Sequence, residues 1–342
     1  MTQRAPLLAG LGVIAVWGLN FPLQKAILGQ MSPLANVGAR FLIVPVCALL
    51  LLLWRYRLDW PRLTRADAVP LLRVALVGQV AHLVLAAWGM QHSTAFSASV
   101  LLAVGPVFTL LILRLLGVER LGRQQLAGVA VACTGALAFT GDKLLQLQWR
   151  ASLGDAILLL AAALFSYYTV ASKPLIERLG GVVVLAYGTL VATLPALLLT
   201  GPALLRLDWA AVPAWTWWGL LWQVGGGGFL GWLAWGWANE RNGVARTAPL
   251  IYLMPVVAGL SSWAFAGESF GWAKLLAAGA VLAGVALAQF GRRERKAPAA
   301  SATQSRPAHM LEGMTTARRR CIQLALSGLA GLAPSFSGHA AE

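Results

Sequence analysis

The sequence predicts an all-α integral membrane protein in which ten transmembrane helices form two inverted five-helix repeats. Three observations lead to this fold class. The 342-residue chain is 58% hydrophobic and 11% charged, with a mean hydropathy of +0.71, whereas a soluble domain has about 25% charged residues. The charges leave apolar windows of the length that a helix needs to cross a bilayer, about 20 residues. The chain also repeats a set of residues at a fixed spacing.

The apolar windows predict the helices one by one. No charged residue interrupts the interval between Asp155 and Lys173, for example, which fits one helix. The interval from Arg73 to Arg114 is too long for one span, but the polar turn MQHSTAFS divides it. A membrane β-barrel would instead show short alternating segments. In chain order, the predicted helices are 7–28, 33–54, 70–89, 95–116, 122–140, 153–173, 181–201, 213–237, 244–266 and 271–291.

The two ends of the chain differ in composition from the helices. The charged-then-apolar start resembles a secretory signal, but it continues into NFPLQKAILG without a small-residue cleavage site, which favours an uncleaved first helix. The segment 292–342 begins near GRRERK and is rich in Ala, Ser and Pro, which predicts a basic, disordered cytoplasmic tail. In the alternative interpretation, the arginines of this tail contact anionic lipid.

The net charge of +15 is distributed unevenly over the predicted loops. If the N-terminus is cytoplasmic, the outer loops contain only Lys143, Arg150, Arg206 and Lys274, and the inner loops contain most other Lys and Arg residues. The positive-inside rule then predicts that both termini lie in the cytoplasm of a bacterial inner membrane. Because the membrane accounts for the basic charge, we expect lipid contacts and no nucleic-acid partner.

Sequence motifs for catalysis and metal binding are missing. Cys47, Cys133 and Cys321 are far apart and lack metal-ligand spacing, so we expect no disulfide, metal or cofactor. The sequence has no GxxxxGK[ST] phosphate loop, which argues against a primary pump. It also lacks HExxH, GxSxG and paired carboxylates within the helices. We therefore expect that the protein is not an enzyme.

The repeat relates positions that are 149 residues apart. PVFTLLILRLLGVE runs from Pro106 to Glu119, and PVVAGLSSWAFAGE runs from Pro255 to Glu268 with the same proline-to-glutamate spacing. The predicted repeats span 7–140 and 153–291. Five helices is an odd number, so the second repeat must enter the membrane from the opposite side. Inverted repeats are typical of secondary transporters, in which the two halves rock around a site near the midplane.

Several of these segments resemble one transporter family. WGLNFPLQK, SPLANVGARF, PVFTLLILRLLGVERLGRQQLAGVAVACTG and PVVAGLSSWAFAGESFGWAKLLAAGAVLAGV are similar to the EamA branch of the drug/metabolite transporter superfamily. The resemblance covers residues 7 to 291. It implies a ten-helix inner-membrane permease that exports amino acids or related small metabolites. Because the superfamily is broad in substrate, a flippase of lipid-linked sugars or a nucleotide-sugar carrier is the alternative.

Polar side chains within the apolar helices are the candidates for substrate binding. Lys25 and Arg40 would each cost about 2.5–3.5 kcal/mol if uncompensated at the bilayer centre, so we expect one or both to bind a substrate carboxylate. Snorkelling of these side chains to the outer interface is the alternative. The other candidates are Asn20, Gln24, Gln79, His82, Tyr168, Trp222, Gln223, Trp235 and Tyr252.

These other candidates also have structural alternatives. The amides and tyrosines line a polar cavity or form hydrogen bonds between helices. His82 is either a proton carrier or a packing residue, and no carboxylate is expected deep in a span. Trp222, Gln223, Trp235 and Tyr252 would suit an apolar or aromatic substrate.

Two further features are expected to be structural. The four glycines 225–228 permit either close helix contact or a bend in the predicted helix 213–237. Glu119 and Glu268 precede the predicted helices 122–140 and 271–291, where a negative charge complements the N-terminal helix dipole.

Overall fold

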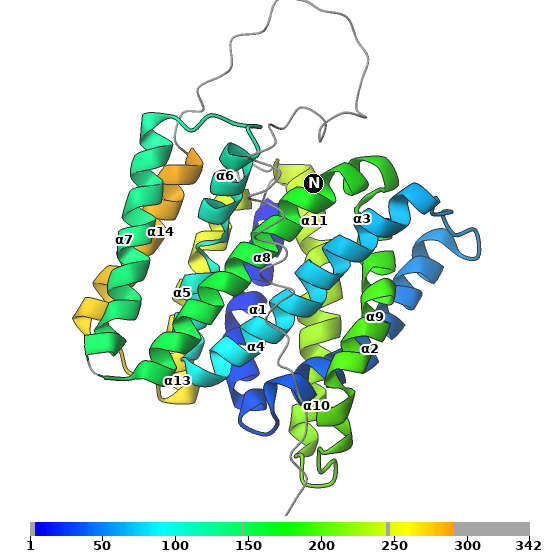
Figure 1. Cartoon of the computed structure of the whole chain (residues 1–342), viewed down its shortest axis with the longest axis horizontal. Helices are drawn as coiled ribbons and strands as arrows, with labels where there is room; N and C mark the ends of the chain where they lie inside the picture. The colour runs from blue at the N-terminus through cyan, green and yellow to red at the C-terminus, as the bar shows by residue number, and fades with distance from the viewer. Residues whose placement is uncertain (1–3, 146, 244–246, 291–342) are drawn as a thin grey trace, which may run out of the picture. The chain divides into compact units, whose positions relative to one another are not determined.

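The computed structural model describes residues 4–145, 147–243 and 247–290, and the regular structure in these ranges is entirely helical. The predicted tail, 292–342, lies outside the described residues. In chain order the elements are α1 (Arg4–Leu28), α2 (Pro33–Tyr56), α3 (Arg65–Ala75), η1 (Leu76–Ala81), α4 (His82–His92), α5 (Ala95–Leu102), α6 (Gly105–Leu115), α7 (Arg123–Leu145), α8 (Trp149–Leu179), α9 (Gly181–Leu205), α10 (Ala214–Leu221), η2 (Trp222–Leu230), α11 (Gly231–Asn242), η3 (Ala248–Leu253), α13 (Met254–Ala266) and α14 (Trp272–Phe290) (Figure 1).

The predicted all-α membrane fold is confirmed. Eight helical stretches among the described residues are long and apolar enough to cross a membrane. The helices α7 and α10–η2–α11 fill the two remaining predicted ranges but are not among these eight, so the count of ten crossings stays a prediction. Large apolar side chains such as Leu198 and Leu276 are 72% and 73% exposed, as expected for a surface that contacts lipid.

Of the helices that are longer than predicted, two contain charged residues of the bundle in their extended ends or close to them. The helix α7 continues to Leu145, so Lys143 belongs to a helix and not to a loop. The helix α8 begins at Trp149, so Asp155 lies two turns inside it. At its other end, α8 stops at Gly180, whose φ of +85° is accessible to glycine at little cost.

The predicted helix 95–116 is two helices in the structure. The backbone leaves the helical pattern at Ala103 and Val104, and α6 starts with Pro106 in its first turn. Proline has no N–H to donate and disfavours the helical conformation of the residue before it, so it favours a helix start.

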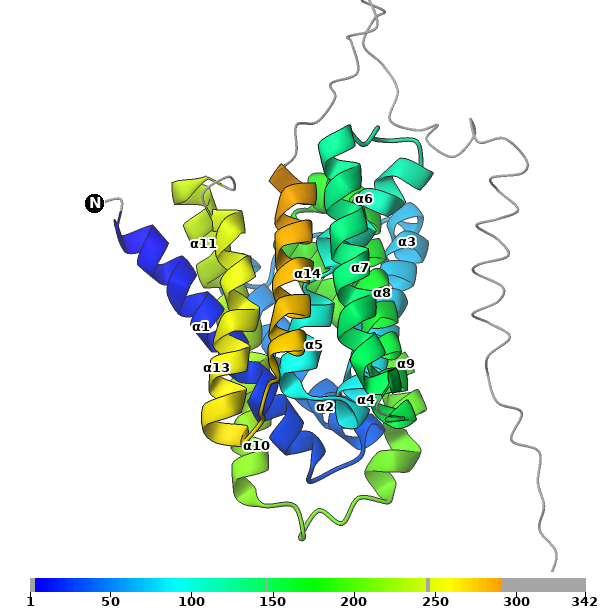
Figure 2. The ribbon, with the colours of Figure 1, turned by 90° about the vertical axis from the view of Figure 1, so that its left-hand side faces the viewer.

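Helices far apart in the sequence pack side by side. The helix α7 lies along α14, and α2 lies along α9 (Figures 1 and 2). The α7–α14 contact is close because Gly128 and Gly284 have no side chains: a Cβ at either glycine would meet the backbone of the other helix. The first helix of each half packs against helices of the other half. The helix α1 packs against α11 and α13, and α8 packs against α4 and α6.

Two π-helical segments occur at corresponding positions of the sequence repeat. Shifting η1 by 149 residues gives 225–230, which lies within η2. A Cβ at Gly78 in η1 would clash with the Tyr168 side chain of α8, and a Cβ at Gly227 in η2 would clash with the Asn20 side chain of α1. The predicted role of the glycine run in close helix contact is therefore confirmed at Gly227.

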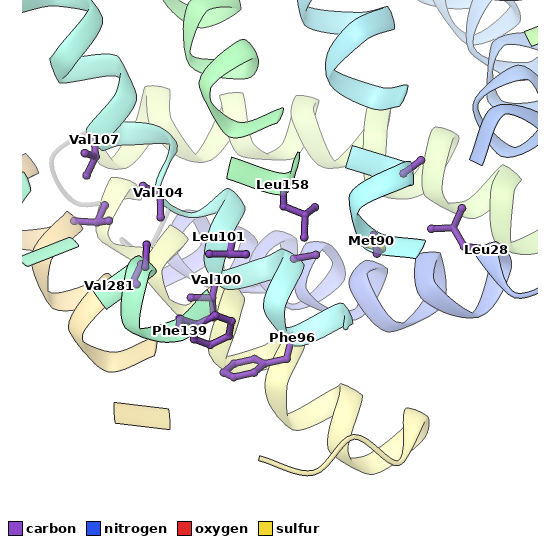
Figure 3. Close-up of a cluster of buried hydrophobic side chains, with 14 of the residues drawn as sticks. Leu28, Met90, Phe96, Val100, Leu101, Val104, Val107, Phe139, Leu158 and Val281 are labelled. Carbon is purple, nitrogen blue, oxygen red and sulfur yellow. The ribbon is translucent and has the colours of Figure 1, made fainter. Parts of the chain in front are cut away.

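The largest apolar core surrounds α5. Figure 3 shows Val100, Leu101 and Val104 beside Leu158 of α8 and Val281 of α14, and all five side chains are at most 2% exposed. The helix α5 thus holds α8 and α14 together. The loop that precedes α5 also collects the charged groups described below.

Candidate functional site

A chain of hydrogen bonds joins polar side chains of α1 and α2. Arg40 Nη1 donates to Gln24 Oε1 at 3.3 Å, and Gln24 Nε2 donates to Asn36 Oδ1 at 2.8 Å. Because a guanidinium can only donate, it fixes the orientation of the Gln24 amide, and this amide fixes that of Asn36. We call these three residues the Arg40 cluster. Asn36 was missed in the sequence because it falls in the first turn of α2, where an amide resembles a helix start.

The Arg40 cluster has hydrogen-bond donors without acceptors. Arg40 Nε and Asn36 Nδ2 are buried and have no partner among the residues that the structure describes. Within the described ranges, no carboxylate lies within ion-pair distance of Arg40. An unsatisfied buried polar group costs about 1–3 kcal/mol, and a charged one costs more. A carboxylate would satisfy these donors, since its two oxygens match the planar guanidinium.

One turn before Gln24, Asn20 connects α1 to η2. Gln223 Nε2 donates to the Asn20 backbone oxygen at 3.2 Å, and Trp17 Nε1 donates to the Gly227 oxygen at 2.7 Å. A π-helical segment interrupts the regular α-helical hydrogen-bond pattern, so Gly227 can accept from a side chain. In the described ranges, Asn20 Oδ1 and Gln223 Oε1 are buried without a hydrogen-bond partner. Asn20 and Gln24 are four residues apart and share one face of α1. Gln223 binds Asn20, and Arg40 binds Gln24.

A second group of predicted residues lies where α8 packs against η1 and α4. Thr189 Oγ1 donates to Gln79 Oε1 at 3.0 Å, and His82 Nδ1 donates to the Ala161 oxygen at 2.9 Å. The Tyr168 side chain covers Gly78, and its ring centroid is 6.0 Å from that of Phe165.

The remaining aromatic candidates lie in different surroundings. Trp235 is 7% exposed and packs against Trp17, with 5.6 Å between ring centroids. The Tyr252 hydroxyl donates to Gln289 Oε1. Trp222 is 51% exposed. In the part of the chain that the structure describes, no hydrogen bond or ring contact joins Trp222 or Tyr252 to the Arg40 cluster.

Lys25, the other predicted cation, contacts backbone oxygens at the end of α4. Its Nζ donates to the oxygens of Met90, Gln91 and Ser93 at 2.9, 2.8 and 2.6 Å. The last carbonyls of a helix have no partner within it and favour a positive charge. The three donors of the Lys25 ammonium are therefore occupied in this structure.

Beside Lys25, Lys143 and Asp155 form a buried ion pair. Lys143 Nζ lies 2.8 Å from Asp155 Oδ2, and the two side chains are 8% and 0% exposed. Ser93 Oγ donates to Asp155, and Lys143 also donates to Ser93 Oγ and Ser97 Oγ at 3.0 and 3.2 Å. Asp155 is a buried carboxylate two turns from the start of α8, and the pair was missed because the predicted helices ended before Lys143 and began just before Asp155. The presence of opposite charges, Lys143 and Asp155, on the two sides of this short loop was the sequence signal that could have indicated the ion pair.

Glu268 completes this arrangement from the second half of the chain. Its Oε1 and Oε2 accept from the backbone N–H groups of Ala95 and Phe96 at 2.7 and 3.3 Å. Glu268 was expected to act on the dipole of the helix that follows it, but its carboxylate caps α5 instead. We call Lys25, Ser93, Lys143, Asp155 and Glu268 the charged loop cluster.

Comparison with known proteins assigns the class of this protein. The model of the EamA-like transporter family matches residues 4–141 and 152–290. A Salmonella typhimurium protein named "probable amino-acid metabolite efflux pump" is 30% identical over 304 residues, which cover 86% of this chain and 98% of the relative. A "probable terminal-alkyne amino-acid exporter" of Streptantibioticus cattleyicolor is 33% identical over 219 residues, covering 60% of this chain and 68% of the relative.

A solved crystal structure has the same fold. It superposes with a TM-score of 0.57 at 19% sequence identity, and the match covers 84% of this chain and 98% of that chain. The family match extends over nearly all of the described helices. The chain therefore belongs to the EamA-like transporter family and is a transporter rather than an enzyme.

Proposed function

We propose that the protein exports amino acids or closely related small metabolites, and that Arg40 binds the substrate carboxylate. The observation that carries this proposal is that the Arg40 guanidinium has no carboxylate partner among the described residues: its Nε is buried without an acceptor there, and its Nη1 donates to the neutral Gln24. A buried charge in a membrane helix normally has a partner. The names of the relatives, an amino-acid exporter and an amino-acid metabolite efflux pump, agree with a carboxylate-bearing substrate.

The mechanism within this proposal is alternating access of two inverted repeats, 7–140 and 153–291. The paired π-helical segments and the reciprocal packing of α1 and α8 support it. In each half, a glycine of the π-helical segment packs against a side chain of the other half's first helix: Gly78 against Tyr168 of α8, and Gly227 against Asn20 of α1. The two repeats can then change their relative tilt around α1 and α8. This proposal keeps the predicted topology, with both termini on the cytoplasmic side of the bacterial inner membrane.

Transport by reconstituted protein tests the role of Arg40. The purified protein is reconstituted into liposomes that are loaded with unlabelled proteinogenic amino acids. Counterflow of each radiolabelled amino acid is then measured. Losing a hydrogen bond to a charged group costs about 1.5–3 kcal/mol, so we expect Arg40→Gln to lower counterflow by about tenfold or more. Arg40→Lys should retain part of it, because the charge remains and the planar fork is lost.

The control is Lys173→Gln, which removes a cation whose side chain is 75% exposed and whose contact with Glu177 is 3.9 Å. It should transport like the wild type. Full activity of Arg40→Gln, or wild-type protein that moves no amino acid, would refute the proposal. In cells, expression of the wild type but not of Arg40→Gln should confer resistance to toxic amino-acid analogues, which tests the direction of transport.

A further inference from the structure

We propose that Gln223 and Asn20 form an ammonium subsite beside the Arg40 cluster, so that the protein distinguishes free amino acids from carboxylates without an α-ammonium. This inference rests on the proposed function, because it assigns the other end of the same substrate. It extends that function by predicting which chemical class of carboxylate binds best.

The proposed subsite contains hydrogen-bond acceptors that no described residue donates to. Gln223 is 4% exposed, and its Nε2 donates to the backbone oxygen of Asn20. A backbone carbonyl can only accept, so the orientation of the Gln223 amide is fixed and its free atom is the oxygen. Asn20 Oδ1 is a second buried acceptor without a partner. Two unsatisfied oxygens are costly unless a donor with several N–H groups satisfies them, and an α-ammonium has three.

The position of these oxygens relative to the Arg40 cluster matches an amino acid. Asn20 and Gln24 are four residues apart on α1, so they lie on the same face about 6 Å apart along the axis. Gln24 holds Arg40 and Asn36, whose free groups are donors. Donors therefore lie at one turn of α1 and acceptors at the preceding turn. In an α-amino acid, the carboxylate and the ammonium are attached to one carbon, so a single substrate can bind the donors and the acceptors of neighbouring turns.

The site provides neutral oxygens rather than a carboxylate for the ammonium. The two carboxylates of the charged loop cluster are already engaged: Asp155 binds Lys143, and Glu268 binds two backbone N–H groups. Gly227 helps to place the acceptor, because its missing side chain leaves room for the Asn20 amide against η2. In this arrangement, the charge of Arg40 binds the substrate carboxylate. The amide oxygens of Gln223 and Asn20 bind the substrate ammonium.

Ligand binding to purified protein tests this subsite. We would measure the affinities of L-alanine, L-leucine and L-phenylalanine and compare each with its deaminated acid, namely propanoate, 4-methylpentanoate and 3-phenylpropanoate. The wild type should bind the amino acids at least tenfold more tightly. Gln223→Met keeps the length of the side chain and removes its polar atoms, so it should abolish this ratio while leaving the affinity for the deaminated acids unchanged.

Two further measurements keep the result interpretable. N-acetyl-L-leucine should bind wild-type protein as weakly as 4-methylpentanoate, and this comparison needs no variant. Gln289→Met is the matched control, because this glutamine accepts from Tyr252 on α14, and it should preserve the ratio.

The outcomes separate the two proposals. A wild-type ratio near one, or a Gln223→Met variant that weakens both classes equally, would overturn the ammonium subsite and leave the carboxylate site at Arg40 intact. Arg40→Gln should weaken both classes. If it weakens neither, or if no probe binds the wild type, the proposed function itself fails.

Discussion

The charged loop cluster and the Arg40 cluster both place ionic groups inside an apolar bundle, but they differ in how these groups are satisfied. In the charged loop cluster, Lys143 faces Asp155, and Lys25 and Glu268 each bind backbone groups at the two ends of one loop. In the Arg40 cluster, the guanidinium has a neutral partner and a free Nε. A satisfied charge contributes to the fold, whereas an unsatisfied one is available to a ligand.

The largest effect on stability is expected in the charged loop cluster. Removing one partner of a buried ion pair leaves the other charge uncompensated and costs about 3–5 kcal/mol. Asp155→Ala should therefore lower the free energy of unfolding by about that amount, measured by denaturant unfolding in detergent. Asp155→Leu combined with Lys143→Met should recover much of the loss, because neither charge remains. A double variant as unstable as the single one would show that the pair is not what stabilises this region.

A smaller effect is expected where η2 meets α1. Gly227→Ala introduces a Cβ against the Asn20 amide, and overpacking of this kind costs about 1–3 kcal/mol. Because Asn20 shifts, amino-acid transport should fall as well. Gly225→Ala is the matched control, since a Cβ at Gly225 meets nothing within 4 Å. Equal transport by the two variants would show that the Asn20 position is not critical.

The contact of Glu268 should have a still smaller effect. Its carboxylate accepts from the first two N–H groups of α5, in addition to the N-cap residue Thr94, and the loss of a cap costs typically about 1 kcal/mol. Glu268→Ala should lower the free energy of unfolding by this amount and leave transport largely intact. Glu177→Ala, whose side chain is 66% exposed, should change neither, and a larger loss for Glu177→Ala would contradict this assignment.

The two clusters also differ in how well the sequence predicted them. The apolar windows predicted the helices. Polar groups are rare in such windows, which is why the sequence indicated Arg40, Gln24, Asn20 and Gln223 as site residues. Their mutual contacts could not be predicted, since they depend on how α1, α2 and η2 pack. The partners of Arg40 became known only from that packing.

The charged loop cluster was missed for a different physical reason. Hydropathy ends a predicted helix near the first charge, so Lys143 and Asp155 were assigned to the ends of apolar segments or to the loop between them. The structure continues both helices past these charges, because each charge neutralises the other. A long-range cap such as Glu268 on α5 has no local signal, since the partners are more than 170 residues apart.

The smallest effect on stability, and the sharpest test of the comparison, is expected for Arg40→Met. Arg40 has no carboxylate partner among the described residues, so its replacement by an apolar side chain breaks no ion pair there and removes the cost of desolvating the charge. We therefore expect a free energy of unfolding equal to or above that of the wild type, together with a loss of amino-acid counterflow of about tenfold or more. Transport and stability would thus respond in opposite directions, unlike in Asp155→Ala. If Arg40→Met instead unfolds as readily as Asp155→Ala, Arg40 is a structural residue, and the distinction between a satisfied and an available charge does not hold for this protein.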